Sequence, residues 1–226
     1  MNDSLINHYR SIFNDIAKSH LVPDIIPEKA TFLFILESPH IQELKFGAPV
    51  SGASGLSMTH HLFADRFQIP LGQLAIAAKN NELQDPLLEQ VALMNACQVP
   101  LQKSAYAGSP IMDKYQKEWS LFEEIRVTNQ RLSYSNESLD AISQVIAGSL
   151  HKKLKKLTDR ALYVIPCGKF AKKFSQLASV SSPNWEWIDG IPHPSYNNWS
   201  KPSYRVAVKR LTTLFSSTAV QDAQRS

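Results

Sequence analysis

Cysteine is nearly absent from this chain of 226 residues, which contains only Cys97 and Cys167. Neither residue belongs to a CxxC pair, so the sequence excludes a disulfide framework and a closed zinc or iron–sulfur site built on cysteine. Both are expected to be reduced and buried as small apolar side chains. We accordingly expect no metal and no other cofactor.

Long apolar runs are also lacking. No run approaches the roughly 20 residues that cross a membrane, and residues 1–4 show no basic stretch before an apolar core. The resulting prediction is a cytoplasmic protein with no membrane partner. The formal net charge of +4 is a modest excess that fits a polyanionic partner. The sequence leaves the oligomeric state open.

The size and apolar content of the chain are those of one globular domain. A chain of 226 residues with 43% hydrophobic residues can bury a substantial core. We predict a single domain over residues 1–215. Residues 216–226 are small and polar, which is typical of a disordered tail.

The apolar residues alternate between helical spacing and short continuous runs. Residues 4–20 have helical spacing, with Asp3 or Ser4 placed to cap the first turn. Four apolar runs have the composition of buried parallel strands, at 31–36, 91–95, 162–166 and 185–188. Strands that alternate with helical stretches indicate an α/β domain with a mostly parallel sheet. The polar stretch 108–138 is predicted to form loops with a short helix around 115–125.

Polar motifs follow each of the predicted strands. They are residues 37–55, Asn95, Gly168 with Lys169, and His193. Ligands of parallel α/β sheets bind outside the carboxyl ends of the strands. We therefore expect these motifs to line one site.

The stretch from Leu36 to Gly55 carries the most informative motif. Leu36-Glu-Ser-Pro-His40 is followed by Gly47-Ala-Pro49 and Gly52-Ala-Ser-Gly55. This spacing resembles the first motif of the uracil-DNA glycosylase superfamily, in particular the branch with Gly-Glu-Ala-Pro-Gly and then Gly-x-Pro-Phe-Val-Gly-x-x-Gly. The positions in register are Glu37, Pro39, Gly47, Pro49, Gly52 and Gly55.

Three further segments follow in the order of that family. Residues 93–100 resemble its segment with a base-reading Asn before a Pro, and residues 164–171 resemble its strand followed by Gly-x-x-Ala. The third is His193-Pro194-Ser195, and together the pieces span most of residues 31–200. The resemblance implies a three-layer α/β/α fold around a central, mostly parallel four-stranded sheet.

The chain departs from this branch at three points. It lacks the four cysteines that usually hold an iron–sulfur cluster there. Ser38 stands where efficient uracil glycosylases often have Asp or Asn, and it cannot act as a base at neutral pH. Val50 replaces the Phe of the usual stacking face, so Phe46 is the nearest candidate for stacking on a base. Activity is therefore expected to rest on Glu37.

The resemblance implies hydrolysis of the bond between a base and its deoxyribose. Such cleavage places positive charge on the sugar and negative charge on the departing base. His193 is expected to hydrogen-bond the base carbonyl, and removing such a donor typically costs about 2.7–4 kcal/mol of barrier. Glu37, with Ser38 beside it, would orient a water or offset the charge on the sugar. Asn95 has the donor and acceptor that read a pyrimidine edge.

The remaining candidates are assigned from their places beside these motifs. Contacts with the base are expected from Pro39, His40, Phe46, Val50 and Asn95. Contacts with DNA are expected from Gly52, Ser54, Gly168, Lys169, Ser195, Tyr196 and Trp199. Within the second group, Ser195 could bind a phosphate, and Tyr196 or Trp199 could fill the gap left by a flipped nucleotide. The basic run 151–156 is either a further phosphate contact or a solvated helix face.

Each of these assignments has a structural alternative. His193 could be a loop residue held by two prolines, Glu37 a cap for a nearby helix, and Asn95 a partner of local backbone. Two rival chemistries are a Ser/His hydrolase and a metal site. The hydrolase would use Ser54 or Ser38 with His193, but it lacks the Gly-x-Ser-x-Gly spacing. The metal site would use His40, Glu43, His60 and His61.

A protein that binds without cutting is the main alternative function. A fold does not imply an activity, and Ser38 and Val50 replace two residues that the chemistry usually uses. The prediction is a DNA glycosylase that removes uracil or another altered base from single- or double-stranded DNA. The alternative is a catalytically impaired relative that binds nucleic acid or a nucleotide.

Overall fold

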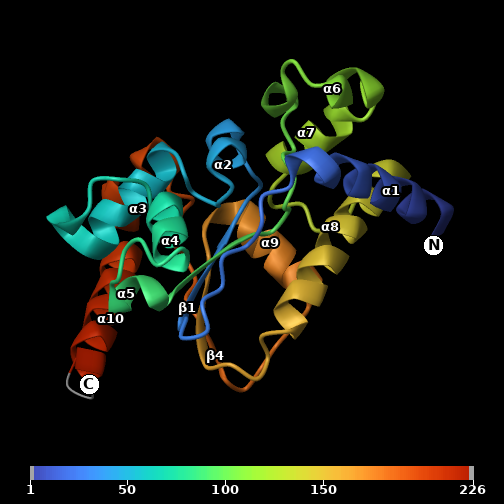
Figure 1. Ribbon diagram of the computed structural model, residues 1–226. Helices are drawn as coiled ribbons and strands as arrows, with labels where there is room; N and C mark the ends of the chain where they lie inside the picture. Colours follow the sequence, from blue (N-terminus) through green and yellow to red (C-terminus); the bar gives the residue numbers. More distant parts are fainter. Residues whose placement is uncertain (1–2, 224–226) are drawn as a thin grey trace.

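Four parallel strands form the central sheet of a computed structural model, which describes residues 3–223 and gives only the backbone of 219–223 (Figure 1). The strands are β1 (Phe32–Leu36), β2 (Val91–Asn95), β3 (Leu162–Pro166) and β4 (Trp185–Trp187). Their order is β2-β1-β3-β4, and each neighbouring pair is parallel. The predicted four-stranded sheet is confirmed, with all strands at the expected places.

Helices cover both faces of the sheet, which is why every residue of β1 and β2 is buried. One face packs against α1 (Asp3–His20), α7 (Trp119–Val127), α8 (Glu137–Lys155) and α9 (Gly168–Ala178). The other face packs against α3 (Ala53–Phe63), α4 (Leu71–Lys79) and α10 (Arg205–Ala223). Successive residues of β1 alternate between these two cores, since Leu33 belongs to the first and Phe34 to the second. The three-layer α/β/α architecture is thus confirmed (Figure 1).

Short helices occupy the connections between these layers. They are α2 (Ile41–Phe46), α5 (Pro86–Glu89), α6 (Pro110–Lys114) and the 3₁₀ turns η1 (Ala64–Arg66), η2 (Lys103–Tyr106), η3 (Ser195–Ser200) and η4 (Pro202–Tyr204). The stretch 108–138 differs from its prediction because it holds two helices, α6 and α7, instead of one. Ser109 caps α6 and Pro110 starts it, while the buried Trp119 and Phe122 fix α7 on the core.

The end of the chain also differs from its prediction. Helix α10 continues through 216 to Ala223, where a disordered tail was predicted, and residues 224–226 lie outside the described part. The helix is anchored on the core by Leu211 and Phe215, which are fully buried, and the hydroxyls of Ser216, Ser217 and Thr218 bond to carbonyls of the preceding turn. Neither α10 nor any other helix within 3–223 is long and apolar enough to cross a membrane.

The loops after β1 and β3 leave the sheet toward opposite faces. Strand β1 leads through α2 to α3, whereas the neighbouring β3 leads to α9 on the other layer. Where adjacent strands diverge in this way, a crevice forms beyond their carboxyl ends, and parallel α/β folds bind ligands there. This divergence positions the site described next.

Candidate active site

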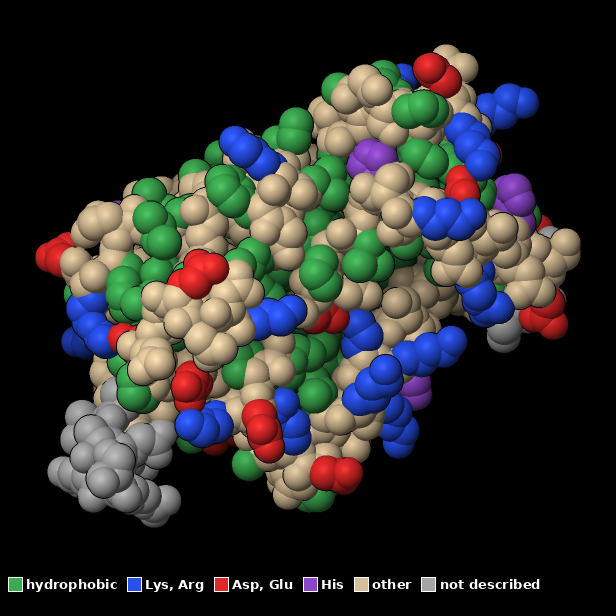
Figure 2. All heavy atoms as spheres, viewed as in Figure 1, with side chains coloured by type: hydrophobic (Ala, Val, Ile, Leu, Met, Phe, Trp, Pro, Cys, Tyr) green, Lys and Arg blue, Asp and Glu red, His purple; other side chains and the backbone are tan. Residues whose placement is uncertain are grey.

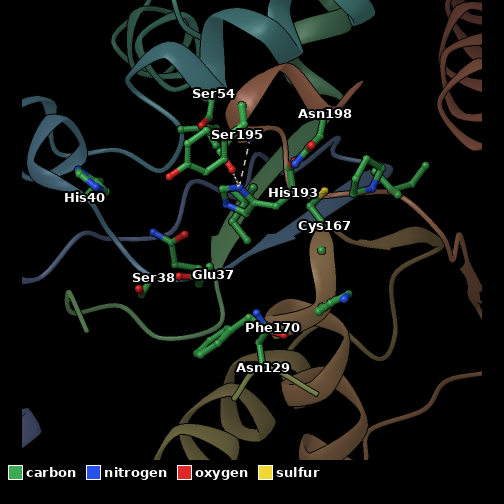
Figure 3. Close-up of a pocket in the computed structure, with 18 of the residues that line it drawn as sticks. Glu37, Ser38, His40, Ser54, Asn129, Cys167, Phe170, His193, Ser195 and Asn198 are labelled. Atoms are coloured by element: carbon green, nitrogen blue, oxygen red, sulfur yellow. Dashed lines mark hydrogen bonds between the residues drawn. The ribbon is translucent and has the colours of Figure 1, made fainter. Parts of the chain in front are cut away.

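A cavity of about 780 Å³ lies at the carboxyl ends of β1, β2 and β3 (Figure 3). Ligand pockets typically measure about 300–1,000 Å³, so a base with part of its sugar fits this size class. The cavity brings together predicted residues from all four motifs: Glu37, Ser38, His40, Val50, Gly52, Ser54, Asn95, Gly168, Lys169, His193, Ser195 and Tyr196. Residues from distant parts of the sequence thus line one cavity, as the motif order led us to expect.

Three predicted site residues do not line this cavity, and their assigned contacts are corrected. Pro39 is buried beside it. Phe46 lies on α2 with 38% of its surface exposed, outside the lining, so it offers no stacking surface to a bound base. Trp199 is 1% exposed in the core, and its indole N–H donates to the carbonyl of Pro192 over 2.9 Å. A tryptophan held in this way cannot fill a gap in DNA.

His193 is held in one tautomer by the residue two positions later. The backbone N–H of Ser195 donates to Nδ1 of His193 over 3.2 Å, and the Ser195 hydroxyl lies 2.9 Å from the same nitrogen (Figure 3). Because Nδ1 accepts, the proton of the neutral ring is on Nε2. Burial lowers the pKa of His193 to about 4, so the ring is neutral at pH 7. The cavity therefore contains a neutral N–H donor.

The loop that carries His193 is fixed at both ends. The side-chain amide of Asn198 donates to the carbonyl of His193 over 3.1 Å, and Trp199 anchors the same loop to Pro192. Between these anchors Tyr196 has φ +53° and is 89% exposed. A left-handed, exposed aromatic residue is uncommon and persists only where the surroundings impose it. Tyr196 thus stands at the mouth of the cavity on a rigid support.

Glu37 faces a cation that the sequence did not indicate. One carboxylate oxygen of Glu37 lies 3.8 Å from a guanidinium nitrogen of Arg126, at the end of α7. Burial raises the pKa of Glu37, and the charge of Arg126 acts in the opposite direction. Arg126 comes from the stretch 108–138, whose sequence indicated no role. Its Nε atom is buried without a hydrogen-bond partner among the described residues.

Two further polar side chains of the cavity have no partner in the described part of the chain. The hydroxyl of Ser38 and both amide atoms of Asn95 are buried without a hydrogen bond of normal distance and angle, although the Asn95 amide lies close enough to the Glu43 carboxylate to lower its pKa. Asn95 is only 1% exposed, yet it lines the cavity. Buried polar groups are nearly always hydrogen-bonded, so groups left without a partner in a cavity are available to a ligand. Asn95 therefore supplies a donor group and an acceptor to the bound molecule.

Glu43 holds the loop between α2 and α3, whereas the sequence indicated it only as a candidate metal ligand. Its two carboxylate oxygens accept the backbone N–H groups of His40 and Val50, each over 2.6 Å. Burial raises the pKa of Glu43 to about 7, against the lowering effect of these two hydrogen bonds and of the nearby Asn95 amide. Val50 has φ +49°, a strained conformation for a β-branched residue, and its N–H is held by this carboxylate. The strained segment around Val50 is thus fixed by one buried side chain.

An aromatic wall comes from a different element than predicted. Phe170, in the first turn of α9, lines the cavity, and its ring centroid lies 4.5 Å from that of Phe174 behind it. Figure 3 shows Phe170 and Asn129 on one side of the cavity and Ser54 and Ser195 on the other. The only sequence signal for this wall was the helix start at Gly168, which did not show which side chains would turn toward the ligand.

The two rival chemistries receive no support from this geometry. The serine bonded to His193 is Ser195, not Ser38 or Ser54, and a ring with a pKa near 4 is too weak a base to activate a serine at neutral pH. Across residues 3–223 no group of three or more His, Cys, Asp or Glu side chains is placed to hold a metal. Of the predicted metal ligands, Glu43 is occupied by backbone groups and His60 lies beside Gln68.

Comparison with known proteins adds no family to this description. No protein-family model and no curated protein matches the chain. The functional argument therefore rests on the side chains of the cavity, on their protonation states and on the fold that brings them together.

Proposed function

We propose that the protein is a cytoplasmic DNA glycosylase that hydrolyses the N-glycosidic bond of uracil or another altered base in DNA. One observation carries the proposal: the neutral Nε2–H donor of His193, the unpartnered amide of Asn95 and the carboxylate of Glu37 line the same cavity. These are the three groups needed to stabilise a departing base, to recognise it and to direct water at its sugar. The proposed chemistry uses no metal.

Base departure assigns a role to each group. As the bond from C1′ to the base nitrogen breaks, its electron pair stays on the base, and negative charge develops on the base carbonyl oxygen. His193 donates Nε2–H to that oxygen without giving up the proton, because a neutral imidazole is a very weak acid. The Glu37 carboxylate orients a water whose oxygen bonds to C1′ and takes up the proton that this water loses. The base anion takes up a proton from solvent and Glu37 releases the one it gained, so the products are the free base and an abasic sugar.

The surrounding walls fit a flipped nucleotide. Phe170 lines the cavity with only 2% of its surface exposed, and under this proposal a base that enters contacts its ring; base–aromatic stacking is worth about 1–3 kcal/mol per base in comparable sites. Lys169 and Lys172 line the cavity, and Lys172 also pairs with Asp189 at 3.1 Å. Under this proposal both lysines contact phosphates beside the flipped nucleotide. The exposed ring of Tyr196 is placed to fill the gap in the base stack.

The test is base release from labelled oligonucleotides. The substrates carry uracil, hypoxanthine, xanthine or modified cytosines in single- and double-stranded form, and alkali cleaves the abasic sites that result. We expect strand breaks with the wild type and a loss of about a hundredfold or more in His193→Ala, as for removal of a preorganised donor. His60→Ala is the matched control, because His60 is exposed, bonds Gln68 and does not line the cavity. Equal rates for the two variants would contradict the proposal.

A nucleotide-binding protein without catalysis is the second candidate, and Ser38 favours it. The hydroxyl of Ser38 is buried in the cavity without a partner among the described residues and has no basic character at neutral pH. If no substrate yields breaks while the wild type binds uracil-containing oligonucleotides and Asn95→Ala does not, this second function replaces the first.

A further inference from the structure

A buried ion pair lies directly behind Asn95, outside the cavity. The ammonium group of Lys153, on α8, is 3.1 Å from a carboxylate oxygen of Asp24, and the two side chains are 15% and 11% exposed. Lys153 belongs to the basic run 151–156, whose other lysines, Lys152, Lys155 and Lys156, are exposed. Figure 2 shows such Lys and Arg side chains grouped over the lower end of α8. Lys153 alone turns inward, so it is neither a phosphate contact nor part of the solvated face.

Both members of the pair bond to the backbone of the same residue. The N–H of Asn95 donates to Oδ1 of Asp24 over 3.2 Å, and Nζ of Lys153 donates to the carbonyl oxygen of Asn95 over 2.5 Å. The pair therefore satisfies the donor and the acceptor of one peptide position at once. A single residue at the end of β2 is held from two directions.

The position of β2 in the sheet explains why these backbone groups needed partners. β2 is an edge strand, with β1 on one side only. On its free side Leu93 exchanges two hydrogen bonds with Ile25, of 2.8 and 2.9 Å. Asn95, two residues further along, points its N–H and C=O to the same free side. There the Asp24–Lys153 pair takes the place that a neighbouring strand would have.

We infer that the Asp24–Lys153 ion pair is a positioning device that fixes Asn95 for recognition of the base edge. This inference rests on the proposed function and adds two residues to it that do not touch the substrate. The Asn side-chain amide can discriminate between bases only if its backbone is held in place. If the backbone moves, the amide donor and acceptor can hydrogen-bond to the edges of several different bases. Burying two charges is costly. If the free edge of β2 had only a structural role, water or another strand could bond to its backbone N–H and C=O groups instead. The position of the ion pair behind the residue proposed to recognise the base explains why two charges are buried there.

The decisive experiment is a mutant cycle between the pair and Asn95. Asp24→Asn with Lys153→Met removes both charges together, so that neither remains buried alone. We expect this double variant to lower kcat/KM for base release about tenfold in the wild-type background and by less than about twofold in the Asn95→Ala background. Equal losses in both backgrounds would mean that the pair only supports the fold, and would overturn the inference.

A second ion pair provides the matched control. Asp85 is 6% exposed and bonds Arg66, which is 52% exposed, and neither residue lines the cavity. Asp85→Asn with Arg66→Met likewise removes one carboxylate and one cation. Any loss of kcat/KM that it causes should be the same in the wild-type and the Asn95→Ala backgrounds.

A readout without catalysis separates this inference from the proposed function. Selective ¹⁵N labelling of Asn residues reports hydrogen exchange of the Asn95 backbone amide. We expect about tenfold faster exchange in the Asp24/Lys153 variant than in the Asp85/Arg66 control. If the wild type releases no base, the proposed function fails, and unchanged exchange would then overturn the positioning role on its own.

Discussion

Gly168 and His193 are in contact so close that no side chain fits between them. A Cβ atom on Gly168 would lie 2.8 Å from Cβ of His193 and 3.0 Å from its backbone nitrogen. Gly168 also has φ +90°, and its N–H donates to the carbonyl of Ile191 over 2.9 Å. The turn from β3 to α9 thus directly supports the loop that carries the proposed catalytic histidine.

Gly168→Ala is therefore expected to displace His193. The backbone strain costs about 1–3 kcal/mol of stability, and a shift of about 1 Å at a reacting group can lower the rate about a hundredfold. Thermal unfolding and kcat for base release measure the two effects. Gly148→Ala is the control, because Gly148 is exposed in the middle of α8 and a Cβ atom there would have no neighbour within 4 Å. The Gly148→Ala variant should gain about 0.5–1 kcal/mol of stability and keep the wild-type kcat. A normal kcat in Gly168→Ala would contradict the role of the Gly168–His193 contact.

Phe170→Leu tests the aromatic wall. Leucine keeps most of the apolar volume but removes the flat ring, so binding of a substrate should weaken by up to about 1–3 kcal/mol. The measurement is the Kd for an oligonucleotide with a non-cleavable uracil nucleoside. Phe174→Leu is the matched control, since Phe174 is about as buried as Phe170, lies on the same helix in contact with it and does not line the cavity. Both variants should lose about 1 kcal/mol of stability, and only the first should lose affinity; equal affinities exclude stacking on Phe170.

The sequence predicted those features that depend on short-range pattern. The apolar runs indicated all four strands, because a strand buried on both faces needs continuous apolar residues. The rule that ligands bind at strand ends brought Glu37, Asn95 and His193 to one place, and the cavity contains all of them. These predictions required only local composition and the order of elements.

The remaining site residues depend on contacts that local pattern does not encode. Arg126 reaches Glu37 from a helix far along the chain, and Lys153 reaches Asn95 across 58 positions. Trp199 resembled an exposed aromatic of a polar loop, but tertiary packing buries it. Phe46, close to the motif in sequence, lies outside the cavity, while Phe170 from a distant helix lines it. Nearness in sequence was a poor guide to which side chains meet the ligand.

Glu43 should make the stability of the protein depend on pH. Its carboxyl pKa is raised to about 7 from the ordinary value of 4.5, so the folded state binds more protons than the unfolded state between these values. The free energy of unfolding contributed by Glu43 therefore falls as pH rises from 4.5 through 7. Glu43→Gln removes this dependence, and it loses one of the two backbone hydrogen bonds, at a cost of about 1–3 kcal/mol.

Urea unfolding of the two proteins at pH 5 and pH 8 measures this difference. The variant should be the less stable protein at pH 5, and the gap should narrow at pH 8, because only the wild type loses the contribution of Glu43. The comparison cancels the opposite effect of His193, whose lowered pKa makes stability rise with pH between about 4 and 6.5 in both proteins. A gap that stays the same or widens toward pH 8 would show that Glu43 is already ionised at pH 5, and would contradict a raised pKa.

Arg126→Gln tests which group limits the rate at low pH. Under the proposed function base release requires the Glu37 carboxylate, so kcat/KM falls as pH drops through the pKa of Glu37. Arg126 lowers that pKa against the effect of burial. Its removal should therefore move the acid limb of the pH–rate profile to higher pH, with the largest loss of rate on the acid side.

Lys172→Gln is the control, because it removes the same charge from another wall of the cavity, where Lys172 pairs with Asp189 instead of Glu37. It should raise KM through lost phosphate attraction while the acid limb stays in place. If both variants leave the limb unmoved, a group other than Glu37 controls it, and the water-directing role passes from that carboxylate to another residue of the cavity.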